Sequence, residues 1–589
     1  MLSNLAYIID KNMYIGGRKM SKLNGYGKRI TALALVAAMT VSFTACGGKN
    51  DAENASQPAV SKVSDPMAKY DQPVTMNVGR QTGTNARLPK GDTFENNAYT
   101  RTLKDKLNIV IKDAFEANGE DYDRQVSLAM TGNSLPDMLV VDSRNDLKEM
   151  VENDQIADLT DVYNSYASDK IKEIYDSYKD VFSGGAFDKC TFDGKIMGLP
   201  DVTGDSGSNI VWVRQDWADK LGIKLDEDGD GCLKLDELKS LAKQFVEKDP
   251  GGTGKPVGIP VQPYPTNGDN DGGSFTLTGI ANAFNAFPKR WQKYANGKVV
   301  YGTTTNETKE FLTTMAGWFK EGIIDPQAGT RTWDDCQGLL VNGQTGIAFG
   351  MWHMPDWCLN QVKEKDPKAE FHCYAIADKN NKVNFMHVAP HEKYVVVRKG
   401  YEHPEAVIKI LNLFYDQLKG KNASTVMPNI DEALKMDDST RPINIELLDA
   451  DFYLRSYEQI MAGAKDKSKI DDIDVTADKL YAKEIANYNK DPKAATTQEW
   501  SHYNSRVFGL GLYHSLTQKN MFNWQIPAFT GTTDSMESMW TNLDKLENEA
   551  TIKIITGAEQ PSYFDTFVKD WKAQGGDQIT SEIEKQAEK

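Results

Sequence analysis

Strands alternate with helices along most of this chain, and that alternation limits the possible folds more than any other feature of the sequence. PVTMNVGR at 73–80 has the alternating apolar pattern of a half-buried strand, and residues 99–115 predict a helix that runs into a strand. LPDMLVVD then places a buried strand at 138–141, after another helix. Strands separated by helices indicate βαβ units, so we expect an α/β fold around a mostly parallel sheet.

The same strand–helix order begins again after FDGKIMGLP at 192–200. NIVWVRQDW at 209–217 predicts a strand leading into a helix, and residues 237–248 and 308–325 have the periodicity of amphipathic helices. GQTGIAFGMW at 343–352 predicts a glycine-rich strand. Because 589 residues are too many for a single core, we expect two lobes. The predicted division gives residues 70–195 and 350–420 to lobe 1, and residues 196–349 and 421–589 to lobe 2.

The first residues of the chain predict export. Basic residues precede an apolar run at 30–45, which is shorter than the roughly 20 residues of a spanning helix. A basic flank, a short apolar stretch and small residues at its end are typical of a secretory signal, which we place at 1–45. A start at Met20 would give this signal a more usual length than a start at Met1, and the sequence leaves both open.

The predicted signal ends in FTAC followed by two glycines. This resembles the bacterial lipoprotein pattern, although Phe43 stands where leucine is commoner. Two acyl chains attached at Cys46 would anchor the protein stably, whereas a plain signal peptide would leave Cys46 without a role. Residues 46–69 are small, polar and proline-containing, so they predict a flexible tether. We expect a body on the extracellular face of the bacterial cytoplasmic membrane, held there through its lipid anchor only.

Charge, cysteine spacing and absent motifs exclude several function classes. With 84 acidic against 68 basic side chains the net charge is -16, which repels nucleic acid and anionic membrane surfaces. The five cysteines after Cys46 are an odd number at irregular spacing; they indicate neither a disulfide framework nor a zinc site, and leave one bridge open. The motifs HExxH, GxSxG and GxxxxGKS/T do not occur. Carboxylates are abundant in any acidic chain, so they do not indicate glycoside hydrolysis.

DEDGDGCLKLDE at 226–237 has the spacing of a calcium-binding EF-hand loop. Gly231 permits the sharp turn, and Lys234 departs from the pattern because an ammonium group cannot ligate, so water or Asp236 must fill that vertex. The predicted calcium ligands are Asp226, Asp228, Asp230, the backbone carbonyl of Cys232, and Glu237. A sensor normally has paired loops, so we expect structural Ca²⁺ here; an acidic turn that caps the helix at 236–248 is the alternative.

Several segments together resemble extracellular solute-binding proteins of ABC importers. They occur in that family's order: LPDMLVVD, FDGKIMGLP, VRQDWADKLGI, WFKEGIIDP, GQTGIAFGMW and HPEAVIKILNLFY. The resemblance runs from about Pro73 to Thr580, and its C-terminal part is similar to the large lipoprotein branch that includes alginate- and oligosaccharide-binding proteins. It implies the two-lobed type II periplasmic-binding-protein fold, ligand in the cleft between the lobes, and calcium in the turn that corresponds to 226–237.

A sugar cleft needs flat aromatic faces and planar polar groups, carried on loops that follow the carboxyl ends of strands. That rule selects Trp352, Tyr264, Arg80, Gln81, Asp142, Arg144, Asp205 and Trp357 as ligand-binding candidates. Trp291 and Trp524 are weaker candidates, while Trp217 and Trp318 are predicted to lie in the core. For the charged residues, a solvated loop position is the alternative.

The resemblance implies a monomeric binding protein with no catalytic residues. It would capture a carbohydrate, an oligosaccharide or another small solute by hinge closure, and deliver it to ABC permease subunits. A polysaccharide-degrading enzyme and a ligand receptor for a surface signalling system are the alternatives. The sequence does not name the sugar, and family analogy alone favours carbohydrate.

Overall fold

The computed structural model describes most of the chain after residue 64. The described residues are 65–83, 87–179, 181, 185–204, 207, 209–266, 273–387, 393–418, 422–433 and 436–587. The predicted signal, Cys46, most of the predicted tether and Asp205 lie outside them. Among the described residues, none of the helices combines the length and the hydrophobicity that a membrane crossing requires.

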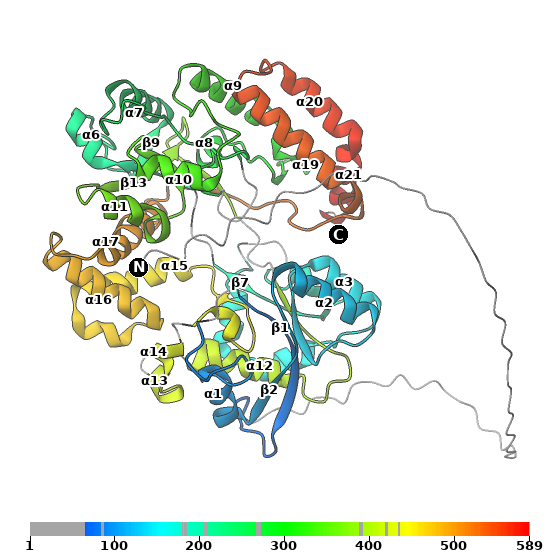
Figure 1. The fold of residues 1–589 in the computed structure, drawn as a ribbon. Helices are drawn as coiled ribbons and strands as arrows, with labels where there is room; N and C mark the ends of the chain where they lie inside the picture. The colour runs from blue at the N-terminus through cyan, green and yellow to red at the C-terminus, as the bar shows by residue number, and fades with distance from the viewer. Residues whose placement is uncertain are drawn as a thin grey trace, which may run out of the picture. The chain divides into compact units, whose positions relative to one another are not determined.

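The first sheet has the strand order β2-β1-β3-β15-β6. Figure 1 shows its strands β1 and β2 beside each other. Its strands are β1 (Val74–Gln81), β2 (Ile109–Ala117), β3 (Met138–Val141), β15 (Tyr394–Val397) and β6 (Leu199–Pro200). β1 pairs in parallel with β2 and β3, whereas β15 is antiparallel to both β3 and β6. Around it lie α1 (Ala98–Leu107), α2 (Gly119–Thr131), α3 (Arg144–Glu152), α4 (Thr160–Tyr166), α5 (Asp169–Asp176) and α12 (Glu405–Asn412). The strands predicted at 73–80 and 138–141 are therefore confirmed.

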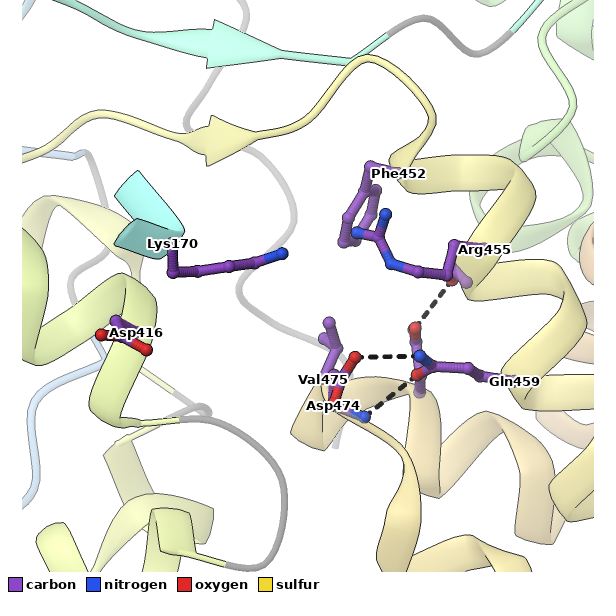
Figure 2. Close-up of a pocket in the computed structure, with 9 residues that line it drawn as sticks. Lys170, Asp416, Phe452, Arg455, Gln459, Asp474 and Val475 are labelled. Carbon is purple, nitrogen blue, oxygen red and sulfur yellow. Dashed lines mark hydrogen bonds between the residues drawn. The ribbon is translucent and has the colours of Figure 1, made fainter. Parts of the chain in front are cut away.

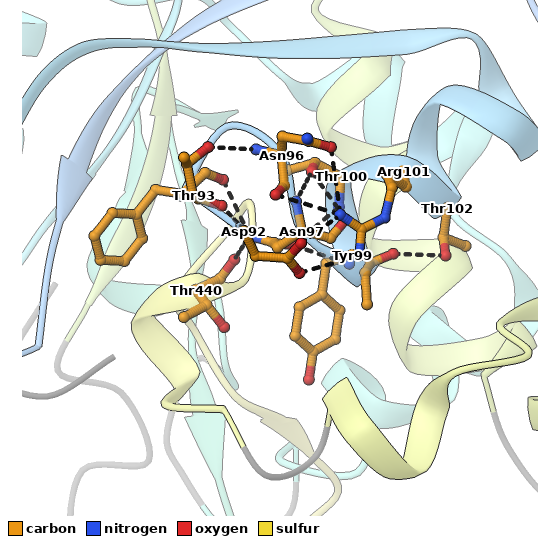
Figure 3. Close-up of polar contacts among 11 residues, drawn as sticks. Asp92, Thr93, Asn96, Asn97, Tyr99, Thr100, Arg101, Thr102 and Thr440 are labelled. Carbon is orange, nitrogen blue, oxygen red and sulfur yellow. Dashed lines mark hydrogen bonds and ion pairs between the residues drawn. The ribbon is translucent and has the colours of Figure 1, made fainter. Parts of the chain in front are cut away.

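A capping box starts α1 and ties it to a distant part of the chain (Figure 3). The Asn97 side chain accepts hydrogen bonds from the backbone N–H of Tyr99 (2.9 Å) and of Thr100 (3.2 Å), and the Thr100 hydroxyl accepts the Asn97 N–H at 2.8 Å. These bonds satisfy helix N–H groups that have no partner inside the helix. Asn97 Nδ2 also donates to the carbonyl oxygen of Thr440 at 3.1 Å. Residues around 440 therefore pack against the start of α1.

The second sheet has the order β12-β8-β13-β9. Its strands are β12 (Ile347–Gly350), β8 (Ile210–Arg214), β13 (Phe371–Ala377) and β9 (Cys232–Lys234). Its core includes side chains of α6 (Gln215–Leu221), α7 (Leu235–Lys248), α8 (Thr278–Ala283), α9 (Asn306–Lys320), α19 (Asp534–Ile555), α20 (Tyr563–Trp571) and α21 (Asp577–Ala587). Trp217 and Trp318 are buried in this core, as predicted.

The expectation of mostly parallel pairing is wrong. In the second sheet β8 is antiparallel to β12 and to β13, and only the short β9 pairs in parallel with β13. The strands β8 and β12 are buried along their whole length. A strand buried on both faces has the same continuous apolar pattern in either direction, so the sequence cannot report the direction of its partner.

The strand pairings also change the predicted division of residues 350–420. β13 belongs to the second sheet and β15 to the first, so the chain changes sheet after Ala377 and before Tyr394. The first-sheet core then continues beyond residue 420, because Ile443, Ile445 and Leu447 are buried within it. In this part β16 (Leu447–Leu448) pairs with β7 (Val202–Thr203). Alternation of strands and helices identifies elements but not the sheet that each one joins.

The remaining elements form helical and ribbon additions. The helical ones are η1 (Asp188–Cys190), η2 (Gly302–Thr304), α10 (Trp333–Val341), η3 (Pro355–Leu359), α11 (Asn360–Lys365), η4 (Leu413–Gln417), α13 (Ala423–Val426), α14 (Ile430–Ala433), η6 (Asp438–Thr440), α15 (Phe452–Lys465), η7 (Lys467–Asp472), α16 (Thr476–Lys490), α17 (Thr497–Tyr503), η8 (Asn504–Leu510), α18 (Gly511–Gln518) and η9 (Lys572–Gly576). The ribbons pair β14 (Val383–Met386) with β17 (Phe522–Gln525), β10 (Trp291–Lys293) with β11 (Val299–Tyr301), and β4 (Thr191–Phe192) with β5 (Lys195–Ile196). α15 and α16 enclose a small apolar core of their own that includes Ile460 and Ile485.

Candidate functional site

Two of the predicted ligand residues meet at the carboxyl edge of the first sheet. β1 ends at Gln81 and its parallel neighbour β3 ends at Val141, so the residues that follow lie at the same edge. Gln81 Nε2 donates a hydrogen bond to Asp142 Oδ2 at 2.8 Å, and the Asp142 side chain is exposed. The strand-end rule therefore placed this polar pair correctly in space, while its contact with a ligand stays a prediction.

Arg80, one residue before Gln81, lies inside the protein. It is 3 % exposed, and its Nε donates to Asp113 Oδ1 of β2 at 2.8 Å. Its Nη1 donates to the carbonyl oxygen of Arg441 at 2.9 Å. Burial raises the pKa of the Asp113 carboxyl above its usual range, and the Arg80 guanidinium opposes that rise. Arg80 thus joins three distant chain segments rather than offering surface to a ligand in this conformation.

Arg144 and Tyr264 lie at separate positions. Arg144 begins α3, where its Nε donates to the carbonyl oxygen of Lys189 at 3.2 Å and its guanidinium lies 5.6 Å from the centroid of the Phe192 ring. Tyr264 is 57 % exposed, which is unusual for so large an aromatic side chain and leaves its face open to a ligand.

Trp352 is surrounded by planar side chains at the end of β12. The strand ends at Gly350, and Trp212 Nε1 donates to the carbonyl oxygen of Met351 at 3.0 Å, which fixes the backbone just before Trp352. The indole is half-buried; its centroid lies 5.6 Å from that of Tyr453 and 5.3 Å from the guanidinium carbon of Arg506. A large aromatic ring that is held by other planar groups and remains partly exposed is suited to stacking on a flat apolar ligand face.

His353 links the two tryptophans that the sequence selects in this region. Trp357 Nε1 donates to His353 Nδ1 at 2.7 Å, and the His353 ring meets the Trp352 ring edge-on at 5.0 Å between centroids. Trp333 packs on the far side of Trp357 at 5.5 Å. Trp352 and Trp357 therefore belong to one aromatic cluster.

Sequence analysis did not identify the polar support of that cluster, which comes from Arg506 and Asp356. The two side chains form an ion pair, although 150 residues separate them in the sequence. No local pattern marks either residue, because each pairs only through tertiary packing of η8 against η3.

Trp524 forms a second aromatic surface with His387, at the adjacent ends of β17 and β14. Their rings are stacked 4.5 Å apart at an angle of 5°. The His387 N–H donates to the carbonyl oxygen of Gln525 at 2.8 Å, which holds the two strand ends together. Trp524 remains 37 % exposed. By contrast Trp291, the other weaker candidate, is buried against Trp571.

The acidic loop brings its three aspartates together. One carboxylate oxygen from each of Asp226, Asp228 and Asp230 lies within 4.8 Å of the other two. Burial and the neighbouring aspartates raise the pKa of Asp226 above its usual range. Gly231 has φ 90°, a left-handed conformation that favours glycine, and a Cβ there would lie 2.7 Å from Leu512.

The other predicted calcium ligands are engaged with the backbone. Glu237 Oε2 accepts the Lys234 N–H at 2.8 Å as part of a capping box that starts α7. The Cys232 N–H donates to Asp230 Oδ1 at 2.8 Å, and Cys232 begins the short strand that pairs with β13. The geometry thus combines the three-aspartate cluster with the helix cap that the sequence offered as the alternative.

A polar pocket of about 250 Å³ opens beside α15 and α16 (Figure 2). Lys170 of α5 and Arg455 of α15 extend into it from different elements. In its wall Ser456 Oγ donates to Asp478 Oδ2 at 2.7 Å, and burial raises the pKa of Asp478 to about 6 while Arg506 opposes the rise. No local sequence pattern marks this pocket, because α5, α15 and α16 form it only by packing together.

Comparisons with known proteins place these features in a family. A profile of the bacterial extracellular solute-binding proteins matches residues 85–417. The polygalacturonan/rhamnogalacturonan-binding protein YtcQ of Bacillus subtilis is 24% identical over 397 residues, which are 67% of this chain and 70% of that protein.

Two solved structures have a similar fold. The alginate-binding protein AlgQ2, solved without calcium ion, has a TM-score of 0.54 at 15% identity, with 89% of this chain and 100% of that chain covered. An EF-hand mutant of the S. pneumoniae substrate-binding protein FusA, in complex with fructo-nystose, has a TM-score of 0.52 at 17% identity, with 88% and 99% covered. The mixed α/β architecture is thus that of known solute-binding proteins, as expected. Since the profile spans more than half of its 589 residues, the chain belongs to the bacterial extracellular solute-binding protein family.

Proposed function

We propose that this protein captures an oligosaccharide outside the cell and delivers it, chemically unchanged, to an ABC permease. The observation that carries this proposal is the pair of partly open indoles, Trp352 and Trp524, each supported by another planar side chain. Flat aromatic faces suit the CH-rich faces of sugar rings, and amide and carboxylate groups such as Gln81 and Asp142 suit their hydroxyls. The relatives support the choice of ligand, because YtcQ is named for binding polygalacturonan and FusA was solved with a fructooligosaccharide.

Capture would proceed by hinge closure. The two main sheets have separate apolar cores and would provide the two halves that close on the ligand. A ligand that contacts both halves only when they are closed shifts the population toward the closed form by its difference in affinity for the two states. The closed form would then dock on the permease as a monomer, held at the outer face of the membrane through lipidated Cys46.

The function is tested with a panel of glycans and metabolites that includes kestose, oligogalacturonides and alginate oligosaccharides. We expect at least one oligosaccharide to raise the melting temperature and to bind one-to-one in titration calorimetry. We also expect chromatography to recover the sugar intact after long incubation. Release of shorter sugars would show an enzyme, and a response to a non-sugar metabolite alone would change the ligand class.

The acidic loop would hold a structural calcium ion. Three carboxylates crowded within 4.8 Å fit a divalent cation that prefers oxygen ligands. Two lysines also reach the loop: Lys234 Nζ lies 3.9 Å from Asp228, and Lys519 Nζ donates to the carbonyl oxygen of Gly229 at 2.8 Å. The predicted further ligands are the Cys232 carbonyl and Glu237. Bound calcium would supply positive charge that offsets the repulsion among the aspartates, and the loop would then join α6 to α7. Two of the structural relatives support this assignment, since AlgQ2 is described without its calcium ion and FusA as an EF-hand mutant.

Removal of calcium with EGTA is expected to destabilise the protein. Extracellular calcium sites have dissociation constants of roughly 10⁻⁴–10⁻³ M, so calcium at about 5 mM contributes about 1–2 kcal/mol. For a chain of this size that is a fall of roughly 1–2 °C in melting temperature, measurable by scanning calorimetry. The matched control is Asp228→Asn with Asp230→Asn, which should melt at the same temperature with and without EGTA. An unchanged wild-type melting temperature would exclude the calcium site.

A further inference from the structure

Arg506 is a buried cation held between two aromatic rings. It is 6 % exposed, and its guanidinium carbon lies 3.7 Å from the centroid of Tyr481 and 5.3 Å from that of Trp352. A guanidinium group is planar and weakly hydrated, so it packs flat on aromatic faces at low desolvation cost. One face of Trp352 is therefore covered by Arg506, and Tyr481 of α16 backs the guanidinium in turn.

The orientation of the guanidinium is fixed by Asp356. Beyond its ion pair with Arg506, Asp356 accepts hydrogen bonds at Oδ1 from Ser501 Oγ (2.8 Å) and Ser505 Oγ (2.9 Å). Arg506 Nη1 also donates to Ser505 Oγ at 2.6 Å. Because the carboxylate itself is anchored by two hydroxyls, the planar fork of Arg506 has one preferred position.

Both partners sit on π-helical turns, which are rare and often mark functional sites. Asp356 lies in η3 (Pro355–Leu359) and Arg506 in η8 (Asn504–Leu510), and the two turns contact each other. The same turn η8 places Gly509 against the backbone of Trp352, where a Cβ would collide with the Trp352 carbonyl oxygen. The ring and the backbone of Trp352 are thus held by one element.

Stability alone is a weak explanation for this arrangement. Replacing a buried ion pair by apolar side chains of similar volume is often neutral or stabilising, so such a pair is better explained by a requirement for one geometry. We propose that Arg506 is a positioning residue: it holds the plane of Trp352 so that the solvent-exposed part of the indole receives a sugar ring. This inference rests on the proposed function for its ligand, but the orientation of Trp352 is measurable without one.

The test combines Arg506→Met with Trp352→Ala in a double-mutant cycle. The first readout is near-UV circular dichroism, in which the Trp352 signal is the difference between wild type and Trp352→Ala. We expect Arg506→Met to remove most of that signal, and to change the spectrum little further when Trp352 is already alanine. Arg506→Lys, which keeps the charge without the planar fork, should restore the signal only in part; it also serves as the second variant if Arg506→Met folds poorly.

Arg214→Met is the matched control. Arg214 is likewise a buried arginine, paired with Asp216 at 2.7 Å and lying 4.7 Å from the ring centroid of Trp217. It lies at the end of β8 that pairs with the start of β12, whereas Trp352 follows the other end of β12. The change that Arg214→Met makes in the near-UV spectrum should be the same with and without Trp352, because the effects of substitutions at independent sites add. A Trp352 signal that survives Arg506→Met would overturn the proposal.

The second readout is the dissociation constant for kestose and for an oligogalacturonide. Where wild type binds a probe, Arg506→Met should weaken it by about tenfold, as Trp352→Ala does, and the double variant should be no weaker than either. Affinity within about threefold of wild type would overturn the positioning role. Failure of wild type to bind either probe would instead count against the oligosaccharide ligand, and the spectral cycle would still decide the role of Arg506.

Discussion

Trp352→Ala is expected to weaken oligosaccharide binding by a factor of about ten or more, while the protein still unfolds cooperatively. The indole is half-buried, and its truncation removes the exposed apolar area that a sugar ring would cover. Aromatic anchors of this kind usually account for more than about 1.4 kcal/mol of binding free energy, which corresponds to tenfold in affinity. Titration calorimetry against the best ligand of the panel measures the change.

Two variants make that result specific. Trp352→Phe keeps an aromatic face and should recover part of the affinity. Trp540→Ala removes another half-buried tryptophan, one that packs on Trp291 and Tyr301 away from β12, and should lower stability without lowering affinity. Equal affinities for wild type and Trp352→Ala would remove Trp352 from the ligand site.

Arg80→Met is expected to lower the free energy of unfolding by about 3–5 kcal/mol at neutral pH. Arg80 and Asp113 are each about 3 % exposed, so the substitution leaves a carboxylate buried without its cation. Denaturant unfolding measures the loss. It should shrink as pH falls, because the pKa of Asp113 is already raised by burial and rises further without Arg80, so that acid neutralises the stranded group.

Two controls separate this effect from a general loss of charge. Arg124→Met breaks an exposed ion pair with Asp121 and should change stability by less than about 1 kcal/mol. Adding Asp113→Asn to Arg80→Met removes the stranded charge and should recover part of the loss. A cost below about 1 kcal/mol for Arg80→Met would mean that Arg80 is not held as the structure shows, and would return it to the ligand candidates.

Local pattern predicted the elements of this fold well because local pattern is what forms them. Alternation at 73–80 became β1, the apolar run at 138–141 became β3, and the periodic segment at 237–248 lies within α7. The spacing of Asp226, Asp228 and Asp230 is likewise a property of twelve consecutive residues, and the structure brings their carboxylates together. The strand-end rule worked for Gln81 and Asp142 because adjacent parallel strands end at one edge.

The same rule failed to anticipate the burial of Arg80, because a strand alternates its side chains and the rule does not say which residue turns inward. The direction of strand pairing in the second sheet could not be predicted from the sequence either, because β8 and β12 are buried on both faces. The change of sheet between Ala377 and Tyr394 depends on pairing with strands more than 150 residues away.

The sequence by itself determined where strands and helices form, which family order they follow, and which loop gathers three aspartates. Only the tertiary structure decided what stands behind Trp352: a guanidinium from η8, a carboxylate from η3 and a ring from α16. The physical reason is that helix and strand periodicity act over a few residues. A buried charge, by contrast, is costly unless it is paired, and its partner can come from any part of the chain that packs beside it.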